Sequence, residues 1–274
     1  MEILRYAAFT DVPSGGNPAG VVLDATGLDD AQMQRIAAEV GYSETAFLTP
    51  AGERAAAVRY FSPRAEVPFC GHATIASAVA YAERFGPGPI RLAAPVGEIA
   101  VDTGDGRATL RTVAPATRAI PAEVGARLLE ALRYTSEDLD PELPLRAAFA
   151  GAWHPVVALR RRERLAGLGY DEPALAALMA EQGWTTVDVV WRESATVFHA
   201  RNPFPPGGVY EDPATGAAAG AFGGYLRELG LVAVPAALTV HQGDDMGRPS
   251  RLLVELDADP ASGVRVTGRA VAIA

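Results

Sequence analysis

Three side chains in the sequence could transfer a proton: the carboxylate of Glu44, the thiol of Cys70 and the imidazole of His72. Glu44 stands between apolar neighbours in a short β-type run, where a partly buried carboxylate could exchange a proton near neutral pH. A thiol and an imidazole at the start of a helix are also suited to proton handling. The plainer alternatives are an outward-facing glutamate, a small buried cysteine and a helix-capping histidine.

The segment around this cysteine is repeated later in the chain. Residues 66–76 read EVPFCGHATIA and residues 211–221 read EDPATGAAAGA. Aligned with a shift of 145 positions, they share Glu-x-Pro-x-x-Gly-x-Ala, with the glycines at Gly71 and Gly216. Each copy begins with an extended strand end that contains a proline. It continues into a run of small apolar residues that is long enough to form a helix. Because a glycine lets a ligand approach the backbone and a helix start attracts anions, two such starts facing each other would bind a carboxylate.

Both runs are apolar nearly all round at their beginnings, over residues 73–79 and 217–222. A helix without a polar face must be enclosed by other structure. We therefore predict an α+β fold of two similar domains, each a curved, mostly antiparallel sheet wrapped around one central helix, with the active site in the cleft between them. The first domain is expected over residues 1–115 and the second over 120–262, joined by a proline-containing link at 114–121.

Polar residues precede the second glycine. Asp212 stands before a proline, so its backbone is held extended at the mouth of the second helix. Its plainer role is that of an N-cap or turn aspartate. Thr215 occupies the place that Cys70 holds in the first copy, but its hydroxyl lacks the acidity of a thiol.

Three further segments are interpreted as turns. Residues 14–18 combine glycines, an asparagine and a proline, so we interpret Asn17 as a turn residue rather than as part of a site. Residues 160–162 form a basic run followed by a glutamate, which is typical of a solvated turn. Residues 241–250 by themselves predict a turn between two strands.

The composition limits the class of protein. At 274 residues the chain is long enough for two domains, each with its own core. Hydrophobic residues at 49%, charged residues at 21% and a net charge of -9 indicate a globular protein and argue against nucleic acid and anionic membranes as partners. No apolar run reaches the roughly 18–20 residues of a membrane span, and the first residues do not resemble a signal peptide. With a single cysteine, these features predict a cytoplasmic location.

The sequence contains no lysine. A Schiff base to pyridoxal phosphate or to a carbonyl substrate needs a lysine amine, and so does a phosphate-binding P-loop, so both classes are excluded. The four histidines are scattered without a His-x-x-x-His pair, and we expect no metal centre. The chemistry is therefore predicted to need no cofactor.

Four motifs connect the chain to a known family. They lie in order between Phe9 and Gly268 and read Gly-Tyr-Ser-Glu-Thr-Ala-Phe, Pro-Phe-Cys-Gly-His-Ala-Thr, Glu-Asp-Pro-Ala-Thr-Gly-Ala-Ala and His-Gln-Gly-Asp-Asp-Met-Gly-Arg-Pro-Ser. Together they resemble the phenazine-biosynthesis PhzF-like family, which belongs to the diaminopimelate-epimerase-like superfamily. The resemblance implies an epimerase-like fold in which residues 264–274 return to the first domain, and it implies a homodimer.

The resemblance also implies roles for single residues. Glu44 falls on the family's general acid/base, and His72 on its active-site histidine. Asp212 and Gly216 fall on its aspartate and glycine. Many members carry a serine where this chain has Ala217, so a hydroxyl donor to the substrate is missing here.

The related epimerases and racemases work with two cysteines on opposite faces of a carbon. Cys70 and Thr215 look like the equivalents of those cysteines. Because Thr215 is no thiol, the two-thiol inversion mechanism is not available to this chain.

Our hypothesis from the sequence is a cofactor-independent isomerase that moves a proton on a small carboxylate-bearing metabolite. Glu44 would act as base and then as acid, while His72 and Asp212 orient the substrate and tune Glu44. The substrate is expected to contact residues at the two helix starts: Cys70, Gly71, Thr215, Gly216 and Ala217. At its most specific, the resemblance implies isomerisation of a dihydro-hydroxyanthranilate. The alternatives are an amino-acid epimerase or racemase with Cys70 and Glu44 as unlike bases, and a non-catalytic small-molecule binding protein, which the alanine at 217 favours.

Overall fold

The computed structural model describes residues 1–274, which form two compact units. Unit 1 consists of residues 1–111 and 267–274, and unit 2 consists of residues 112–266. None of the helices is both long and apolar enough to cross a membrane.

Unit 1 contains a closed sheet. Its strands are β1 (Leu4–Ala8), β2 (Asn17–Val22), β3 (Glu44–Gly52), β4 (Ala55–Phe61), β6 (Ile90–Ala94), β7 (Gly97–Gly104), β8 (Arg107–Arg111) and the later part of β17 (Arg265–Ala272). β1 pairs with β2 and with β17, and β17 pairs with β8, so the order β1-β2-β3-β4-β6-β7-β8-β17 returns to its start. The short strand β5 (Glu66–Val67) pairs with the end of β4.

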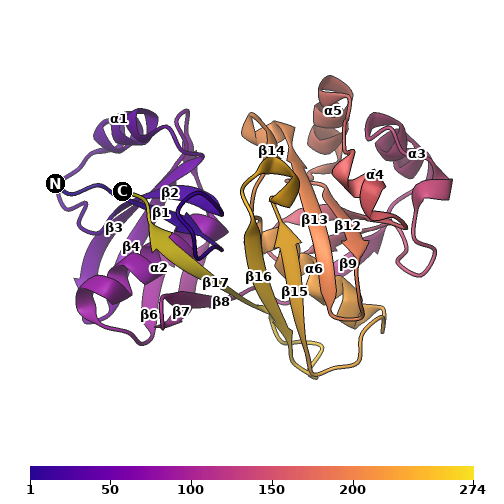
Figure 1. The fold of residues 1–274 in the computed structure, drawn as a ribbon. Helices are drawn as coiled ribbons and strands as arrows, with labels where there is room; N and C mark the ends of the chain where they lie inside the picture. The colour runs from indigo at the N-terminus through magenta and orange to yellow at the C-terminus, as the bar shows by residue number, and fades with distance from the viewer. The chain divides into compact units, whose positions relative to one another are not determined.

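The helix α2 (Gly71–Phe85) runs among these strands and contacts β1, β2, β3, β7 and β8 (Figure 1). Every residue from His72 to Ala80 is buried. A helix with no polar face over its first turns is stable only when it is enclosed, which is what the closed sheet provides. Ile75 is fully buried in this way, and burial of one such side chain contributes about 1.5–3 kcal/mol.

The helix α1 (Asp30–Val40) packs on β3 and β4. Asp29 is its N-cap: the Asp29 side chain accepts from the Gln32 N–H, and the Gln32 side chain accepts from the Asp29 N–H. This capping box satisfies two backbone donors that the helix itself leaves unpaired. The helix ends at Gly41, whose φ of 73° is left-handed.

Unit 2 is built on a mixed sheet in the order β9-β10-β11-β12-β13-β15-β16. These strands are β9 (Ala116–Ala119), β10 (Arg146–Phe149), β11 (Trp153–Leu159), β12 (Asp188–Arg192), β13 (Val197–Phe204), β15 (Ala236–Gln242) and β16 (Ser250–Leu256), and the short β14 (Val209–Asp212) pairs with β13. The helix α6 (Gly216–Glu228) contacts β9, β10, β11 and β16. The remaining helices are α3 (Ala122–Ala131), α4 (Arg162–Ala166) and α5 (Glu172–Gln182), with 3-10 turns at Ser136–Asp138, Pro205–Gly207 and Asp244–Met246.

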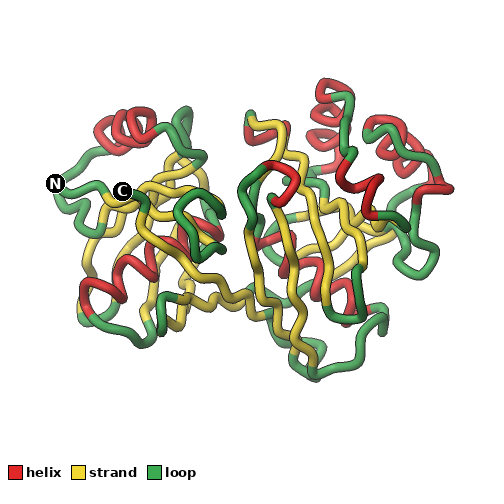
Figure 2. Tube along the Cα trace, in the orientation of Figure 1, coloured by secondary structure: helices red, strands yellow, loops and turns green.

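The repeated sequence segment corresponds to a repeated structural element. Unit 1 contains β4, β5, α2 and β6 in chain order, and unit 2 contains β13, β14, α6 and β15 in the same order. The first and last strands of this element are parallel neighbours: β4 and β6 in unit 1, and β13 and β15 in unit 2. Figure 2 shows strands around a helix in each unit.

Two of the expected turns and links are wrong. The segment at 114–121 contains the strand β9, which pairs with β10; the prolines at 115 and 121 bracket this strand rather than interrupt it. In the basic run at 160–162, Arg160 and Arg161 are exposed before the helix, but a solvated turn is wrong for Arg162, which begins α4 and forms an ion pair with Asp245. In the chain, unit 1 gives way to unit 2 after Arg111.

Glycines inside α6 allow the sheet to approach this helix closely. A Cβ on Gly224 would lie 2.2 Å from the Pro115 Cβ, and a Cβ on Gly223 would lie 2.7 Å from the Val254 Cγ1. Glycine in a helix costs about 1 kcal/mol relative to alanine. Close packing explains why the sequence tolerates this cost.

A chain of buried polar groups crosses the middle of the unit 2 sheet. The Thr186 Oγ1 donates to the Asn202 Oδ1 at 2.7 Å, so it accepts from the His154 Nδ1 at 2.8 Å. The Asn202 Nδ2 donates to the Asp188 Oδ1 at 3.1 Å. Burial lowers the pKa of His154 to about 4 and raises the pKa of Asp188 to about 7.

These two pKa shifts have opposite effects on stability. Because the folded pKa of Asp188 lies above its ordinary value of 3.8, the folded state binds this proton more tightly, and stability falls as the pH rises from about 4 to about 7. Because the folded pKa of His154 lies below its ordinary value of 6.5, stability falls as the pH drops from about 6.5 to about 4. Over the shared range the two slopes, each about 1.4 kcal/mol per pH unit, oppose each other.

We predict that Gly224→Ala destabilises the protein by about 1–3 kcal/mol, because the new methyl group overlaps Pro115. The control is Gly169→Ala, since a Cβ on Gly169 meets no atom within 4 Å. Urea unfolding, monitored by fluorescence, measures the free energy of unfolding of both variants. Equal stability of the Gly224→Ala variant and the wild type would contradict the packing argument.

We also predict that Asp188→Asn raises the free energy of unfolding above pH 7 by about 2–4 kcal/mol, since the variant carries no buried carboxylate to ionise. Near pH 4 the variant and the wild type should be about equally stable. Between these limits the variant should gain stability with rising pH, because only His154 then titrates. Urea unfolding from pH 4 to pH 8 tests this, and a difference that does not change with pH would refute it.

Candidate active site

Three elements of unit 1 bring a group of polar side chains together. Asn17 begins β2, Glu44 begins β3, and His72 lies in the first turn of α2. β2 and β3 are parallel, with Ala19 opposite Glu44, so the starts of both strands lie side by side. The group is completed by Ser43 and by Cys70, the residue that caps the start of α2.

The His72 ring is the centre of this group. Its Nε2 lies 3.3 Å from the Glu44 Oε2 and 3.2 Å from the Ser43 Oγ. Its Nδ1 lies 3.1 Å from the Asn17 Nδ2 and 3.3 Å from the Cys70 Sγ. All four neighbouring side chains therefore contact the same imidazole ring.

The asparagine fixes the tautomer of the ring. An amide nitrogen can only donate, so the Nδ1 of His72 accepts from Asn17. The ring proton is then on Nε2, where it points to the side of Ser43 and Glu44. A neutral His72 thus presents this N–H to the Ser43 hydroxyl oxygen at 3.2 Å, with the Glu44 Oε2 3.3 Å from the same nitrogen.

Burial and contacts decide between the roles left open by the sequence. The Glu44 side chain is 13% exposed, so it is not an outward-facing strand residue. His72 makes contacts with side chains and does not cap the helix. The interpretation of Asn17 as a turn residue is wrong: it is the first residue of β2, it is 1% exposed, and its side chain contacts His72.

The first turn of α2 is anchored from outside the helix. The Thr74 Oγ1 donates to the Cys70 carbonyl oxygen at 2.7 Å and forms a hydrogen bond with the Tyr60 hydroxyl at 2.7 Å. The helix starts at Gly71, so the positive end of its dipole lies beside His72. This anchoring fixes where the helix start can meet an anion.

The same group offers three metal-ligating donors. One donor atom each of Glu44, Cys70 and His72 lies within 4.8 Å of the others. The spacing of histidines along the chain did not indicate this set. Only one of the three donors is a histidine, and Glu44 comes from β3, whereas Cys70 and His72 lie at the start of α2.

A second group surrounds the start of α6 in unit 2. Asp212 ends β14, and its Oδ2 accepts from the Thr215 Oγ1 at 2.5 Å. Thr215 precedes α6 as Cys70 precedes α2, and Gly216 begins the helix. Ala217 is half-buried in the first turn.

Gln242 holds this second group together, a role that the predicted turn over residues 241–250 does not indicate. Its Nε2 donates to the Asp212 carbonyl oxygen at 2.7 Å and to the Thr215 Oγ1 at 3.0 Å. Its Oε1 accepts from the Thr215 N–H at 3.0 Å. Gln242 is 1% exposed on β15, on the same buried face as Leu238 and Val240. In a strand, alternate residues face the same side, so the sequence already places Gln242 on the face of Leu238 and Val240. A polar residue at such a position was the sign of a buried polar contact.

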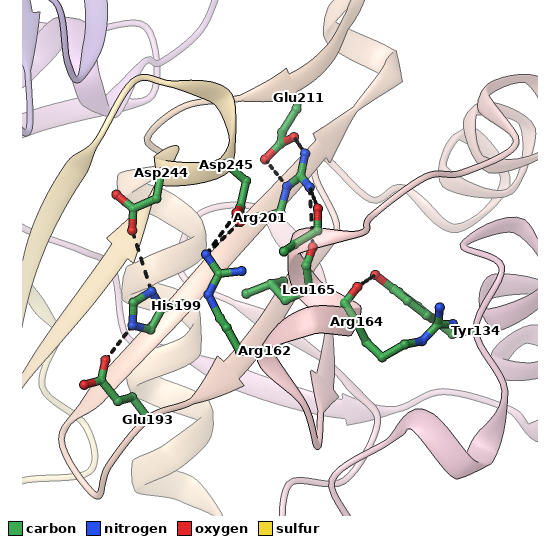
Figure 3. A network of polar contacts seen from close by, with 11 residues as sticks. Tyr134, Arg162, Arg164, Leu165, Glu193, His199, Arg201, Glu211, Asp244 and Asp245 are labelled. Carbon is green, nitrogen blue, oxygen red and sulfur yellow. Dashed lines mark hydrogen bonds and ion pairs between the residues drawn. The ribbon is translucent and has the colours of Figure 1, made fainter.

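The glutamates of the repeated segment both bind arginine. The Glu66 carboxylate accepts from the Arg59 Nε and Nη2, both at 2.7 Å. The Glu211 carboxylate accepts from the Arg201 Nε at 2.9 Å and from its Nη2 (Figure 3). Glu211 directly precedes Asp212, so this pair fixes the strand that carries the aspartate.

The two arginine–glutamate pairs differ in burial. The side chains of Arg201 and Glu211 are 9% and 2% exposed, whereas those of Arg59 and Glu66 are 33% and 35% exposed. Arg201 also donates to the carbonyl oxygens of Leu165 and Ala166 (Figure 3). The buried pair therefore connects β13, β14 and the end of α4.

Further ion pairs hold the 3-10 turn that follows Gln242. Arg162 of α4 pairs with Asp245 at 2.9 Å, and the His199 Nδ1 of β13 lies 3.6 Å from the Asp244 carboxylate (Figure 3). The other ring nitrogen of His199 contacts Glu193 at 2.6 Å. These contacts hold the turn that follows β15, and with it Gln242, the last residue of that strand.

Unit 1 has a closed sheet around a helix and unit 2 a mixed sheet packed on a helix, which define a mixed α/β fold. A solved PhzF-family protein of Bacillus anthracis has this fold, with a TM-score of 0.89 and 26% identity over 100% of this chain and 98% of that chain. The phenazine biosynthesis-like protein family (PhzC-PhzF) matches residues 6–274, and the chain belongs to this family.

Relatives within the family are named isomerases. An uncharacterised isomerase of Deinococcus radiodurans is 38% identical over 92% of this chain and 86% of its own length. A trans-2,3-dihydro-3-hydroxyanthranilate isomerase of Pseudomonas fluorescens is 32% identical over 96% of this chain and 94% of its own length. The chain is accordingly an isomerase of this family.

We predict that Arg201→Met lowers the free energy of unfolding by about 3–5 kcal/mol, because it leaves the buried Glu211 carboxylate without its partner. The matched control is Arg59→Met in the other copy, where the exposed partner stays solvated and the loss should be about 1 kcal/mol or less. Urea unfolding at neutral pH compares the two variants. Similar losses in both would show that burial does not set the strength of this pair.

Proposed function

We propose that this isomerase moves a proton on a small carboxylate-bearing metabolite without a cofactor, and that Glu44 removes and returns the proton. The observation that carries the proposal is the contact of the largely buried Glu44 carboxylate with the Nε2 of His72. A general base needs a fixed position and limited access to water, and this contact supplies the first while burial supplies the second.

The proton removed by Glu44 leaves negative charge on the substrate. The start of α2 at Gly71 would stabilise that charge through backbone N–H groups and the helix dipole. One carboxylate that returns the proton to another carbon on the same face would give a shift of the proton without inversion.

The dihydro-hydroxyanthranilate isomerase among the relatives supports this class of substrate. A ring-bearing carboxylate is therefore the first compound to test. Ala217 offers no hydroxyl to such a substrate, so its affinity would depend on the backbone of the helix starts and on Cys70.

A second candidate is an epimerase with unlike bases. The Cys70 Sγ lies 3.3 Å from the His72 Nδ1, so thiol and carboxylate both contact the same imidazole. Such an enzyme would take a proton from one face of a carbon with Glu44 and return one to the other face from Cys70.

We predict that Glu44→Gln slows proton exchange with solvent by about 10²–10⁴-fold, because the amide cannot accept the proton. Proton NMR in D2O, with dihydro-hydroxyanthranilate and a panel of amino and hydroxy acids, measures this rate. The control is Glu66→Gln, which removes an exposed carboxylate of the same unit and should leave the rate unchanged.

The outcomes separate the candidates. Exchange that survives in Glu44→Gln would refute the assignment of Glu44. Deuterium uptake with loss of optical activity, abolished by Cys70→Ser as well as by Glu44→Gln, would identify the epimerase. Tight binding of a panel compound without any exchange would identify a binding protein.

A further inference from the structure

The three donors around His72 are of different chemical kinds. Cys70 offers a thiolate, His72 an imidazole nitrogen and Glu44 a carboxylate oxygen. Zinc and similar thiophilic divalent cations are bound in proteins by these three groups, most often in tetrahedral sites. Magnesium and calcium prefer oxygen ligands alone, so the donor set selects against them.

The separations suit one ion. Zinc bonds of about 2.0–2.3 Å place neighbouring tetrahedral ligands about 3.3–3.7 Å apart. The His72 Nε2 lies 3.3 Å from the Glu44 Oε2 and 3.8 Å from the Cys70 Sγ. All three donor atoms lie within 4.8 Å of one another. The sulfur is now nearer to Nδ1, at 3.3 Å, and the contact with Asn17 places the ring proton on Nε2. Ligation by Nε2 therefore requires movement of side chains, transfer of that proton to Nδ1 and rotation of the Asn17 amide, so that its oxygen accepts the proton.

The surroundings also favour a divalent ion. Thiolate and carboxylate together carry two negative charges, which a divalent cation neutralises. Cys70 directly precedes α2, so its sulfur lies beside the positive end of the helix dipole. Cys70 and His72 are buried, and Glu44 is largely so, which leaves little water to compete with ligation.

We propose that Glu44, Cys70 and His72 bind one Zn²⁺-like thiophilic divalent cation, and that the bound ion holds the enzyme in an inactive state. The ion takes up the Glu44 carboxylate oxygen that proton transfer uses, together with the His72 Nε2 beside it. The inhibitory half of this inference rests on the proposed function, whereas the binding half does not. Removal of the ion by a chelator restores activity.

Cobalt(II) tests the binding directly, because a Co²⁺–thiolate bond has its own charge-transfer absorption. The chain has one cysteine, so this absorption can come only from Cys70. Titration of chelator-treated protein with Co²⁺ should give a band that saturates at one ion per chain. Zn²⁺ should displace the Co²⁺, and Mg²⁺ should not. Affinity should rise with pH, because thiol and imidazole must lose protons to bind the ion.

Variants identify the ligands. Cys70→Ser should abolish the band, while His72→Gln and Glu44→Gln should weaken Co²⁺ binding by at least about tenfold. The matched control is His241→Gln in unit 2, which removes a histidine that stacks on His199 and should leave Co²⁺ binding unchanged. Absence of the band in the wild type, or an affinity unchanged in His72→Gln and Glu44→Gln, overturns the inference.

The solvent-exchange assay separates this inference from the proposed function. A saturable band together with full exchange in Glu44→Gln would refute the function and support the metal site. Exchange that depends on Glu44 without any band would support the function and refute the metal site. Exchange in the wild type that continues with saturating Zn²⁺ would refute inhibition by the ion.

Discussion

The enclosure of an apolar helix by a sheet is the constraint on which this structure depends. The first turns of α2 have no polar face, and every residue from His72 to Ala80 is buried. Eight strands close around this helix in unit 1, and the last of them, β17, comes from the end of the chain. The start of α2 therefore has a fixed position relative to the strand starts that carry Asn17 and Glu44.

The two copies of the strand–helix element keep the same frame and differ in chemistry. Cys70 and Thr215 precede the two helices, but only the first is a thiol. The repeated glutamates both bind an arginine, yet only the pair of Glu211 and Arg201 is buried. Duplication thus preserved what builds a helix start, and the side chains around each start diverged.

His72 is a buried polar residue whose ring contacts four different side chains. Its ring contacts an amide, a hydroxyl, a thiol and a carboxylate. The amide determines the tautomer, which directs the ring proton to the side of the carboxylate. The Glu44 carboxylate beside this ring can serve proton transfer or metal ligation, and these two uses exclude each other.

The sequence by itself determined the repeat, the two enclosed helices, the family and the candidate residues Glu44, His72 and Asp212, because these depend on spacing and residue type. It misjudged Asn17 and gave Gln242 no role in a site, because turn-like neighbours conceal that both side chains are buried and contact site residues. It also could not reveal the ligand set of Glu44, Cys70 and His72. Only tertiary structure decided these points, since strand pairing and helix packing bring together residues that are far apart in the chain.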